Sequence, residues 1–378
     1  MSGLLRLALK LLLSDRGKFM TLVIGITFSV FLMMLMTSMF FGIIEHSAAN
    51  IINIGAKMWV MDPDVQTPQN SIPMPDYVLD AVRSIPGVEY ALPIYIGAGL
   101  VRLDNGTYQA ATVVGLDDAT LFGRPAVLQG NILDIYRNNA FFVVRDASYP
   151  KLGSPKVGTT FEINDHRGVI VGIARLSVGS LFGLPTLYTT YTRATQDLPS
   201  TRYETSFILV QPKNSRDAPA IETAVRKLGY LALTDSGFIQ RNDRFYEFQT
   251  ALGTNILIMT AISFVVGLSI AAETFYMFVL DNLERFGALK AIGAKNAELV
   301  QMILFQSMTV GFLGFGLGVL LASALVAFGK LRIPNYAAMI TFENIFMALV
   351  MVLIISVISA YIGIRKVIRI DPFDVFRS

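Results

Sequence analysis

Four long apolar runs constrain this chain more than any other feature. Residues 19–44 provide 26 consecutive positions without a charged side chain, enough to cross the hydrocarbon core of a bilayer with some tilt. Similar runs occupy residues 252–280, 303–328 and 345–364, and among these three only the first carries a charge, at Glu273. We therefore expect a membrane protein with four transmembrane α-helices and both termini on one side.

The 206 residues between the first two runs, 45–250, have an ordinary globular composition and are long enough to form their own core. Two predicted helices, 75–84 and 218–228, each precede a glycine-centred turn and an apolar strand, which suggests a weak internal repeat. The fold class predicted is thus four transmembrane helices with a large α+β extracytoplasmic domain inserted between helices 1 and 2. The strand-like segments are 58–61, 91–101, 108–114, 140–144, 168–171 and 206–210.

The inserted domain is expected to connect to the membrane through helical stalks. Residues 243–250 reach the second apolar run without a helix breaker, which predicts one continuous helix rising from the membrane. A matching extension of the first span through residues 49–54 would complete the pair and couple the outer domain rigidly to the membrane helices.

The N-terminal segment, residues 1–18, reads as a basic amphipathic helix on the membrane surface. Its leucines gather on one helical face, with Arg6 and Lys10 on another. A signal peptide is the alternative, but the apolar run that follows is too long and lacks a small-residue cleavage site.

The charges outside the runs orient the chain. Eleven basic and six acidic residues fall in segments 1–18, 281–301 and 365–378, so the positive-inside rule places these segments and both termini in the cytoplasm. We expect a multi-pass protein of the bacterial cytoplasmic (inner) membrane.

Composition excludes several classes of function. A hydrophobic fraction of 53% suits a membrane protein, and a net charge of +3 is no nucleic-acid signature. The chain has no cysteine and only two histidines, so we expect no metal site. No phosphate-binding loop occurs, because Gly329-Lys330 lacks the upstream glycine, and no metalloprotease or serine-hydrolase motif is present. We therefore predict a non-enzyme without catalytic residues or a cofactor.

Individual residues within the spans admit two interpretations each. An ionised Glu273 inside the second run is costly unless it is paired or faces water. It is either structural, as a partner for Arg16 or Lys18 or as the interfacial end of a shorter helix, or it has a conformational or substrate-contact role. A stripe of small residues in the third run would pack within the subunit or in a homodimer; it comprises Gly311, Gly314, Gly318 and Ala322.

Two further groups of apolar residues are also open to two interpretations. The first span is rich in methionine, which indicates lipid-facing packing or, less simply, soft ligands for a metal or haem; these residues are Met20, Met33, Met34, Met36 and Met39. Large side chains in the outer domain would build its core or line a groove; these are Trp59, Phe141, Phe142, Phe182 and Tyr188.

Residues 281–301 form a short charged helix, punctuated by glycine, between two spans. Together with the end of the second span, the stretch ETFYMFVLDNLERFGALKAIGA (273–294) resembles the second-span exit and coupling helix of MacB/FtsX-like permeases of ABC transporters, in particular the DevC-type and HrtB-like branch. The C-terminal RKVIRIDPFDVFR (365–377) resembles the ending of the same family, a basic cluster followed by proline and arginine.

This resemblance implies a homodimeric permease served by a separate ATPase subunit that binds the ATP, with an adaptor protein and an outer-membrane duct where a second membrane exists. Movement of the ATPase would enter through the coupling helix and reach the outer domain, which is called mechanotransmission. Phe286 and Leu289 would anchor the helix in the ATPase groove, and Arg285 and Lys290 would set its register. The residues that the resemblance places at the ATPase are Leu283, Glu284, Arg285, Phe286, Gly287, Leu289, Lys290, Gly293 and Ala294.

Three functions follow as hypotheses. The first is an export permease for an amphiphilic or lipid-like substrate, with haem as an alternative cargo. The second is a transport-free mechanotransmitter that activates an extracytoplasmic partner, as the FtsX-like resemblance implies. The third is a membrane-anchored binding protein without an ATPase.

Overall fold

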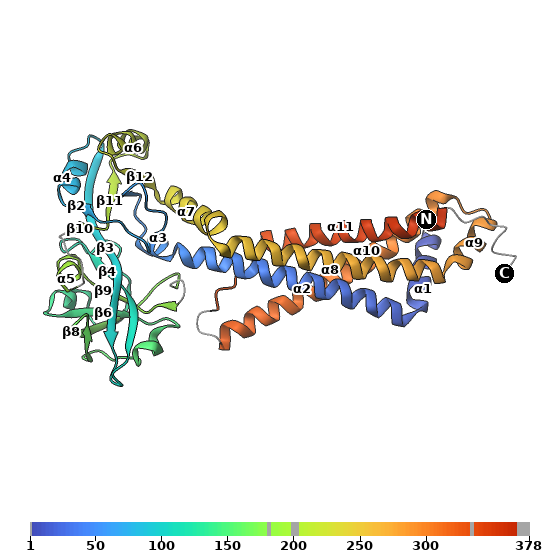
Figure 1. Cartoon of the computed structure of the whole chain (residues 1–378), viewed down its shortest axis with the longest axis horizontal. Helices are drawn as coiled ribbons and strands as arrows, with labels where there is room; N and C mark the ends of the chain where they lie inside the picture. Colours follow the sequence, from blue (N-terminus) through green and yellow to red (C-terminus); the bar gives the residue numbers. More distant parts are fainter. Residues whose placement is uncertain (1, 180–182, 198–203, 333–335, 369–378) are drawn as a thin grey trace. The chain divides into compact units, whose positions relative to one another are not determined.

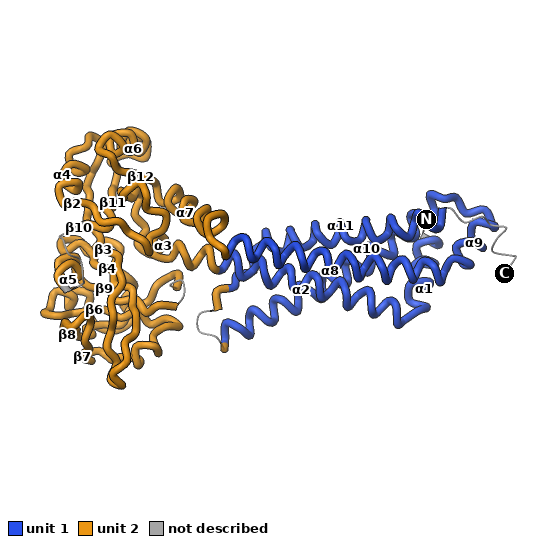
Figure 2. The backbone as a smooth tube through the Cα atoms, viewed as in Figure 1, with its two compact units in different colours: residues 1–42, 252–331, 338–378 blue, residues 43–251, 332–337 orange. Residues whose placement is uncertain are grey.

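The computed structural model describes residues 2–179, 183–197, 204–332 and 336–368 (Figure 1). It contains two compact units (Figure 2). We call residues 1–42, 252–331 and 338–378 the membrane unit, and residues 43–251 and 332–337 the outer domain. The predicted fold class is confirmed. The predicted groove residue Phe182 and most of the C-terminal tail, from residue 369 on, lie outside the described residues.

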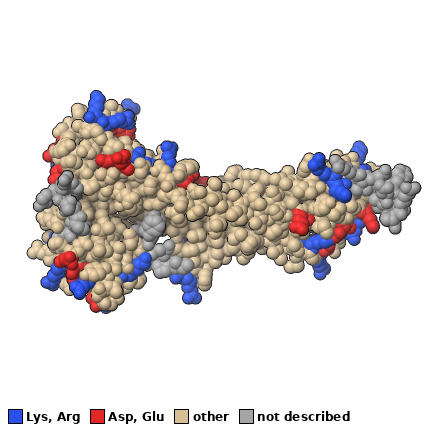
Figure 3. All heavy atoms as spheres, in the orientation of Figure 1, with Lys and Arg blue, Asp and Glu red and all other residues tan. Residues whose placement is uncertain are grey.

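Four helices are long and apolar enough to cross a membrane, and each contains one of the predicted runs. Figure 3 shows, on the face it presents, a middle section of these helices without Lys, Arg, Asp or Glu, and charged side chains gathered at the end that carries α9. The helices of the membrane unit are α1 (Ser2–Ser14), α2 (Arg16–Ser47), α8 (Ala251–Asp281), α9 (Leu283–Ala291), α10 (Asn296–Arg332) and α11 (Phe342–Ile368), with α2 and α8 running on into the outer domain.

The small-residue stripe of α10 packs inside the membrane unit. A Cβ atom at Gly318 would lie 2.6 Å from Val30 of α2, and one at Gly314 would lie 2.7 Å from Ile26 of the same helix. On the neighbouring side, a Cβ at Gly311 would lie 2.3 Å from Ser356 Oγ of α11. The stripe, which ends at the fully buried Ala322, therefore lets α10 approach both α2 and α11 at close range. These contacts correspond to the first of its two interpretations, packing within the subunit.

The first lobe of the outer domain is a split β-α-β arrangement. Its four strands lie in the order β12-β1-β11-β3, and all neighbours are antiparallel. One βαβ half precedes the second lobe and the other follows it, so the suspected repeat corresponds to these two halves. The elements are β1 (Met58–Met61), α4 (Tyr77–Arg83), β3 (Val88–Arg102), β11 (Phe207–Pro212), α6 (Ala218–Lys227) and β12 (Leu231–Thr234), with the two-residue strands β2 (Met74–Pro75) and β10 (Glu204–Thr205) beside them.

The second lobe grows from the same sheet because β3 is long enough to serve both lobes. Its first part pairs with β11 and its second part, from Tyr95 on, pairs with β4. Pro93 is tolerated because β3 pairs there only with β11, and its pairing with β4 begins two residues later, so Pro93 lies at an edge of the sheet. The second lobe contains β4 (Tyr108–Leu116), β5 (Ala126–Gln129), β6 (Ala140–Val144), β7 (Thr160–Ile163), β8 (His166–Arg175), β9 (Thr186–Thr190) and α5 (Tyr191–Asp197), with the 3₁₀ turns η1 (Ile132–Tyr136) and η2 (Tyr149–Leu152). A further 3₁₀ turn, η4 (Ser215–Asp217), belongs to the first lobe and precedes α6.

The large side chains suspected of lining a groove belong to the core. Trp59 is fully buried and packs edge-to-face on Phe207 and at a tilt on Phe238. Phe141, Phe142 and Tyr188 are also buried, and burial raises the pKa of the Tyr188 hydroxyl far above its usual range. These residues therefore stabilise the domain and are closed to a ligand.

The end of α2 is held firmly within the outer domain. Asn242 of α7 (Asp235–Arg244) donates from Nδ2 to Ser47 Oγ at 2.6 Å, and both residues are fully buried. Gln69 Nε2 donates to the Ser47 carbonyl at 2.8 Å and so satisfies one of the open groups at the helix end. After a turn at Ala48 the chain continues as α3 (Ala49–Ile54), which is the predicted extension of the first span.

The second connection is different, and the prediction of one continuous helix there is wrong. After α7 the backbone forms a π-helical turn, Phe245–Gln249, and Thr250 is extended with φ −112° and ψ 156° before α8 begins. These dihedral angles interrupt the i→i−4 hydrogen bonds that a continuous helix requires. Burial and the nearby charge of Glu247 raise the pKa of Asp243 beside this turn, and a hydrogen bond from Asn242 acts in the opposite direction.

The packing of α10 can be tested by adding one methyl group at each of two glycines. Gly318→Ala should lower the thermal midpoint of the detergent-solubilised protein by several degrees, because overpacking typically costs about 1–3 kcal/mol. Gly316→Ala is the matched control, because a Cβ there has no neighbouring atom within 4 Å. Equal midpoints for the two variants would contradict the close contact between α10 and α2.

Candidate functional site

The segment that joins α8 to α10 is the candidate site for a partner. Its helix α9 (Leu283–Ala291) ends where Gly293 adopts φ +105°, a backbone conformation that favours glycine. The amides of Gly293 and Ala294 close the helix by donating to the carbonyls of Lys290 and Leu289 at 3.1 and 3.0 Å. A Cβ at Gly293 would meet no atom within 4 Å, so crowding does not explain the glycine. The positive φ angle does, because other residues rarely adopt it.

One face of α9 belongs to the core of the membrane unit. Phe286 is 0% exposed and Gly287 is also buried. Leu283, Leu289 and Ala294 are partly buried and pack against the same core. The prediction that Phe286 is a surface anchor is therefore wrong, because its ring is already covered by this chain.

The other face of α9 is open. Of the nine residues predicted to contact an ATPase, Glu284, Arg285 and Gly293 are exposed, and Lys290 is half-buried and donates from Nζ to the Ile368 carbonyl at 3.1 Å. The sequence reasoning missed Ile292, whose side chain is 85% exposed directly after the helix. An isoleucine so exposed next to a glycine turn is a candidate contact for a partner.

The start of α9 is tied to the junction of α1 and α2 by polar contacts. Lys18 Nζ forms ion pairs with Asp281 at the end of α8 and, at 3.6 Å, with Asp15. Arg285 Nη1 donates to Ser14 Oγ at 3.0 Å and to Asn282 Oδ1 at 2.9 Å. We call this group of contacts the elbow network; it joins the two places where the chain enters and leaves the spans α2 and α8.

Glu273 lies on the exposed side of α8. Lys18, one of the two partners considered for it, is paired with Asp15 and Asp281 instead. Among the described residues no ion pair to Glu273 occurs. The interpretation of Glu273 as a structural ion-pair partner of Arg16 or Lys18 is therefore wrong for the described residues, and its position at the interfacial end of the helix and its conformational or substrate-contact role stay predictions.

The methionines of the first span do not converge on one site. Met33 and Met34 are buried in the core of the membrane unit, whereas Met20 is 60% exposed on its surface. Over the described residues no group of three or more His, Cys, Asp or Glu side chains is placed to hold a metal ion.

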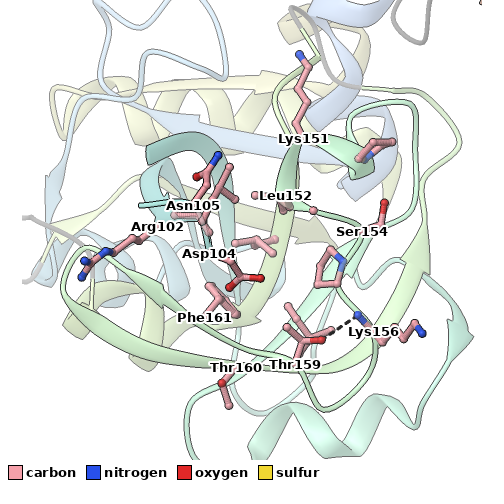
Figure 4. A pocket seen from close by; sticks show the side chains of 17 residues that line it. Arg102, Asp104, Asn105, Lys151, Leu152, Ser154, Lys156, Thr159, Thr160 and Phe161 are labelled. Atoms are coloured by element: carbon pink, nitrogen blue, oxygen red, sulfur yellow. Dashed lines mark hydrogen bonds between the residues drawn. The ribbon is translucent and has the colours of Figure 1, made fainter. Parts of the chain in front are cut away.

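A cleft of about 490 Å³ lies in the second lobe of the outer domain (Figure 4). Its floor is apolar and includes Leu152, Phe161 and Leu187, and its rim carries hydroxyl, amide and charged groups. Figure 4 shows the Asp104 carboxylate facing this space, while Lys151 points away from it and donates to the Gly183 carbonyl at 2.8 Å. No ion pair to Asp104 occurs among the described residues. An apolar floor beside a carboxylate suits an amphiphile with a cationic group.

Two family descriptions match the chain and together cover most of it. The MacB-like periplasmic core domain matches residues 19–228, and the FtsX-like permease C-terminal domain matches residues 256–372. The first match alone extends over more than half of the chain.

Individual relatives are distant. A macrolide export ATP-binding/permease protein MacB of Psychrobacter cryohalolentis is 25% identical over 287 residues, which are 74% of this chain and 41% of the relative. A putative hemin transport system permease protein HrtB of Staphylococcus haemolyticus is 27% identical over 120 residues, 32% of this chain and 33% of the relative. An ABC transporter permease of Mycobacterium tuberculosis, itself named uncharacterized, is 24% identical over 316 residues, 81% of this chain and 80% of the relative.

Among solved structures, the periplasmic region of MacB from Actinobacillus actinomycetemcomitans aligns with a TM-score of 0.39 and 14% identity, over 50% of this chain and 94% of that chain. The chain spans about two fifths of the length of the MacB relative from Psychrobacter. On the two family matches, the chain belongs to the permease family that joins a MacB-like periplasmic core domain to an FtsX-like C-terminal domain.

Proposed function

We propose that this chain is the transmembrane permease subunit of an ABC-type export system in the bacterial inner membrane. ATP-driven movement of a separate ATPase subunit enters through α9 and the exposed Ile292, and reaches the outer domain through the membrane helices. The observation that carries this proposal is the contrast between Phe286 of α9, which is packed in the core of the membrane unit, and Ile292 directly after α9, which is exposed. A segment built in this way both receives a partner and transmits its movement.

That the ATPase is a separate subunit is part of this proposal because the family resemblance implies it. The MacB relatives are named for both ATP binding and permease activity. The homodimer, and an adaptor with an outer-membrane duct, remain parts of the proposal that the family resemblance suggests.

The cargo that we propose is an amphiphile, preferably one with an amine. The apolar floor of the outer-domain cleft and the carboxylate of Asp104 support this class. The name of the MacB relatives, macrolide export, is in accord with an amphiphilic cargo.

Substitution of the open anchor tests the coupling. Ile292→Asp should weaken retention of the partner ATPase on the purified permease roughly 10- to 100-fold, because burying one such side chain contributes about 1.5–3 kcal/mol. Leu133→Asp is the matched control, because Leu133 is 62% exposed but belongs to the outer domain. Phe286→Asp is not a substitute, because it places a carboxylate in the core and should reduce the yield of folded protein. Unchanged retention by Ile292→Asp would contradict α9 as the docking segment.

Single cysteines test the orientation, and the chain contains no native cysteine to interfere. Leu133→Cys should react with a membrane-impermeant maleimide in spheroplasts, whereas Ile292→Cys should react only after the membrane is opened. Labelling of both positions before the membrane is opened would refute the proposed topology.

The cargo class is tested with the permease and its ATPase in nanodiscs. An amphiphilic quaternary amine should stimulate ATP hydrolysis in a saturable manner, and Asp104→Asn should raise its half-maximal concentration about tenfold, the usual effect of losing one charge-assisted contact. Asp80→Asn, which alters an exposed carboxylate on α4, is the control. Stimulation by haem alone would favour the haem exporter, and ATP hydrolysis that responds to neither compound would favour the transport-free mechanotransmitter.

A further inference from the structure

A pocket at the elbow network carries charges that the proposed function leaves unexplained. It has a volume of about 490 Å³ and is lined by Ser14, Asp15, Arg16, Asp281, Asn282 and Arg285. Its two carboxylates, Asp15 and Asp281, are both paired with Lys18. Its two guanidinium groups have no carboxylate partner among the described residues, since Arg285 donates only to the neutral side chains of Ser14 and Asn282. With Lys18 included, this cluster has three positive and two negative charges, and its two guanidinium groups are the positive groups that no described carboxylate pairs with.

The surface of α2 below this pocket is apolar. Met20, Ile24 and Phe28 follow Arg16 at intervals of four residues, so all four lie along one side of the helix. The three apolar side chains are exposed by 60%, 61% and 50% of their surfaces. From Arg16 to Phe28 the helix rises roughly 18 Å, which is comparable with the length of a lipid acyl chain. This side of α2 thus has a cationic end and an apolar stem.

The helix α1 presents the same chemistry beside the pocket. Its inner face is fixed, because Ala8 and Leu12 are fully buried and Gln306 Nε2 donates to the Ala8 carbonyl at 2.8 Å. Its outer face exposes Leu9 and Leu13 together with the cations Arg6 and Lys10. No ion pair to these two cations occurs in the described part of the chain.

The position of the pocket identifies the partner. The uncharged run of α2 begins at Phe19, three residues after Arg16, so the pocket lies where a span leaves the hydrocarbon. Lipid phosphates occupy this level of a bilayer, and basic clusters there attract anionic lipids. Arginine is well suited to phosphate because its guanidinium can bind two phosphate oxygens at once.

We propose that the elbow pocket and the exposed side of α2 bind an anionic phospholipid. Its phosphate lies between Arg16 and Arg285, and one acyl chain follows Met20, Ile24 and Phe28. Because Arg285 belongs to α9 and also contacts Ser14, the bound lipid reinforces the connection of α9 to the α1–α2 junction. Only this last consequence, lipid-dependent coupling to an ATPase, rests on the proposed function.

The site is tested on the full-length permease in detergent without an ATPase, so that the result does not depend on the proposed function. Dioleoyl phosphatidylglycerol should raise the thermal midpoint by several degrees and remain bound in native mass spectrometry. Dioleoyl phosphatidylcholine and inorganic phosphate should do neither, and dihexanoyl phosphatidylglycerol should bind more weakly because it lacks the long acyl chains.

Charge-removing variants identify the residues. Arg16→Gln and Arg285→Gln should each weaken phosphatidylglycerol binding about tenfold, the expected effect of losing a charge-assisted contact. Lys330→Gln is the control, because it removes an exposed charge near the C-terminal end of α10, whereas α9 and the elbow pocket adjoin the N-terminal end. This variant should bind phosphatidylglycerol as the unaltered protein does. For each variant, the thermal midpoint in phosphatidylglycerol is compared with the midpoint of the same variant in phosphatidylcholine. Native mass spectrometry measures the bound lipid independently of the stability of the variant. Equal binding by Arg16→Gln and Lys330→Gln, or equal effects of phosphatidylcholine or of free phosphate, would overturn the proposal.

Discussion

Close approach of helix backbones is the constraint on which the membrane unit depends. Lipid is as apolar as the side chains it surrounds, so burial of leucine does not drive helices together as it does in water. The glycines of α10 compensate for this by bringing its backbone against α2 and α11, and Gly267 of α8 is similarly covered by Ser29 and Ile355. Two hydroxyl groups strengthen these contacts across helices, since Ser29 donates to the Ser263 carbonyl at 2.9 Å and Ser307 to the Ser356 carbonyl at 2.7 Å. The four spans therefore form one packed body.

The segment α9 takes its mechanical character from that body. Because Phe286 is enclosed in the same core as the spans, α9 cannot be displaced without moving the residues around it. The elbow network adds polar contacts from Asp281 and Arg285 to Lys18 and Ser14. These contacts join α9 both to the end of α8 and to the junction of α1 and α2.

Much of the fold could be predicted from the sequence, because long uncharged runs and strongly apolar strands such as Met58–Met61 and Ala140–Val144 leave few alternatives. The strand β5 was missed because all four of its residues are exposed and carry no pattern of burial. The break at Thr250 could not be predicted, because it depends on the φ and ψ angles of Thr250 and no glycine or proline in residues 243–250 indicates it. The family resemblance is confirmed, whereas the segment 281–301 as a docking site stays a prediction. Phe286 and Ile292 are both apolar, and only the packing of α9 shows which of them the chain has already covered.

The two connections between the spans and the outer domain differ in stiffness. The helix α2 continues without interruption to Ser47, whose hydroxyl and carbonyl are both held by amide side chains. The chain that returns to α8 passes instead through a π-helical turn and the extended Thr250. The helical backbone of the first span thus extends into the outer domain, whereas that of α8 ends at Thr250. The outer domain is therefore connected to one span by uninterrupted α-helix and to the other by a non-helical residue, which leaves a single backbone position, Thr250, free of the helical hydrogen-bond pattern.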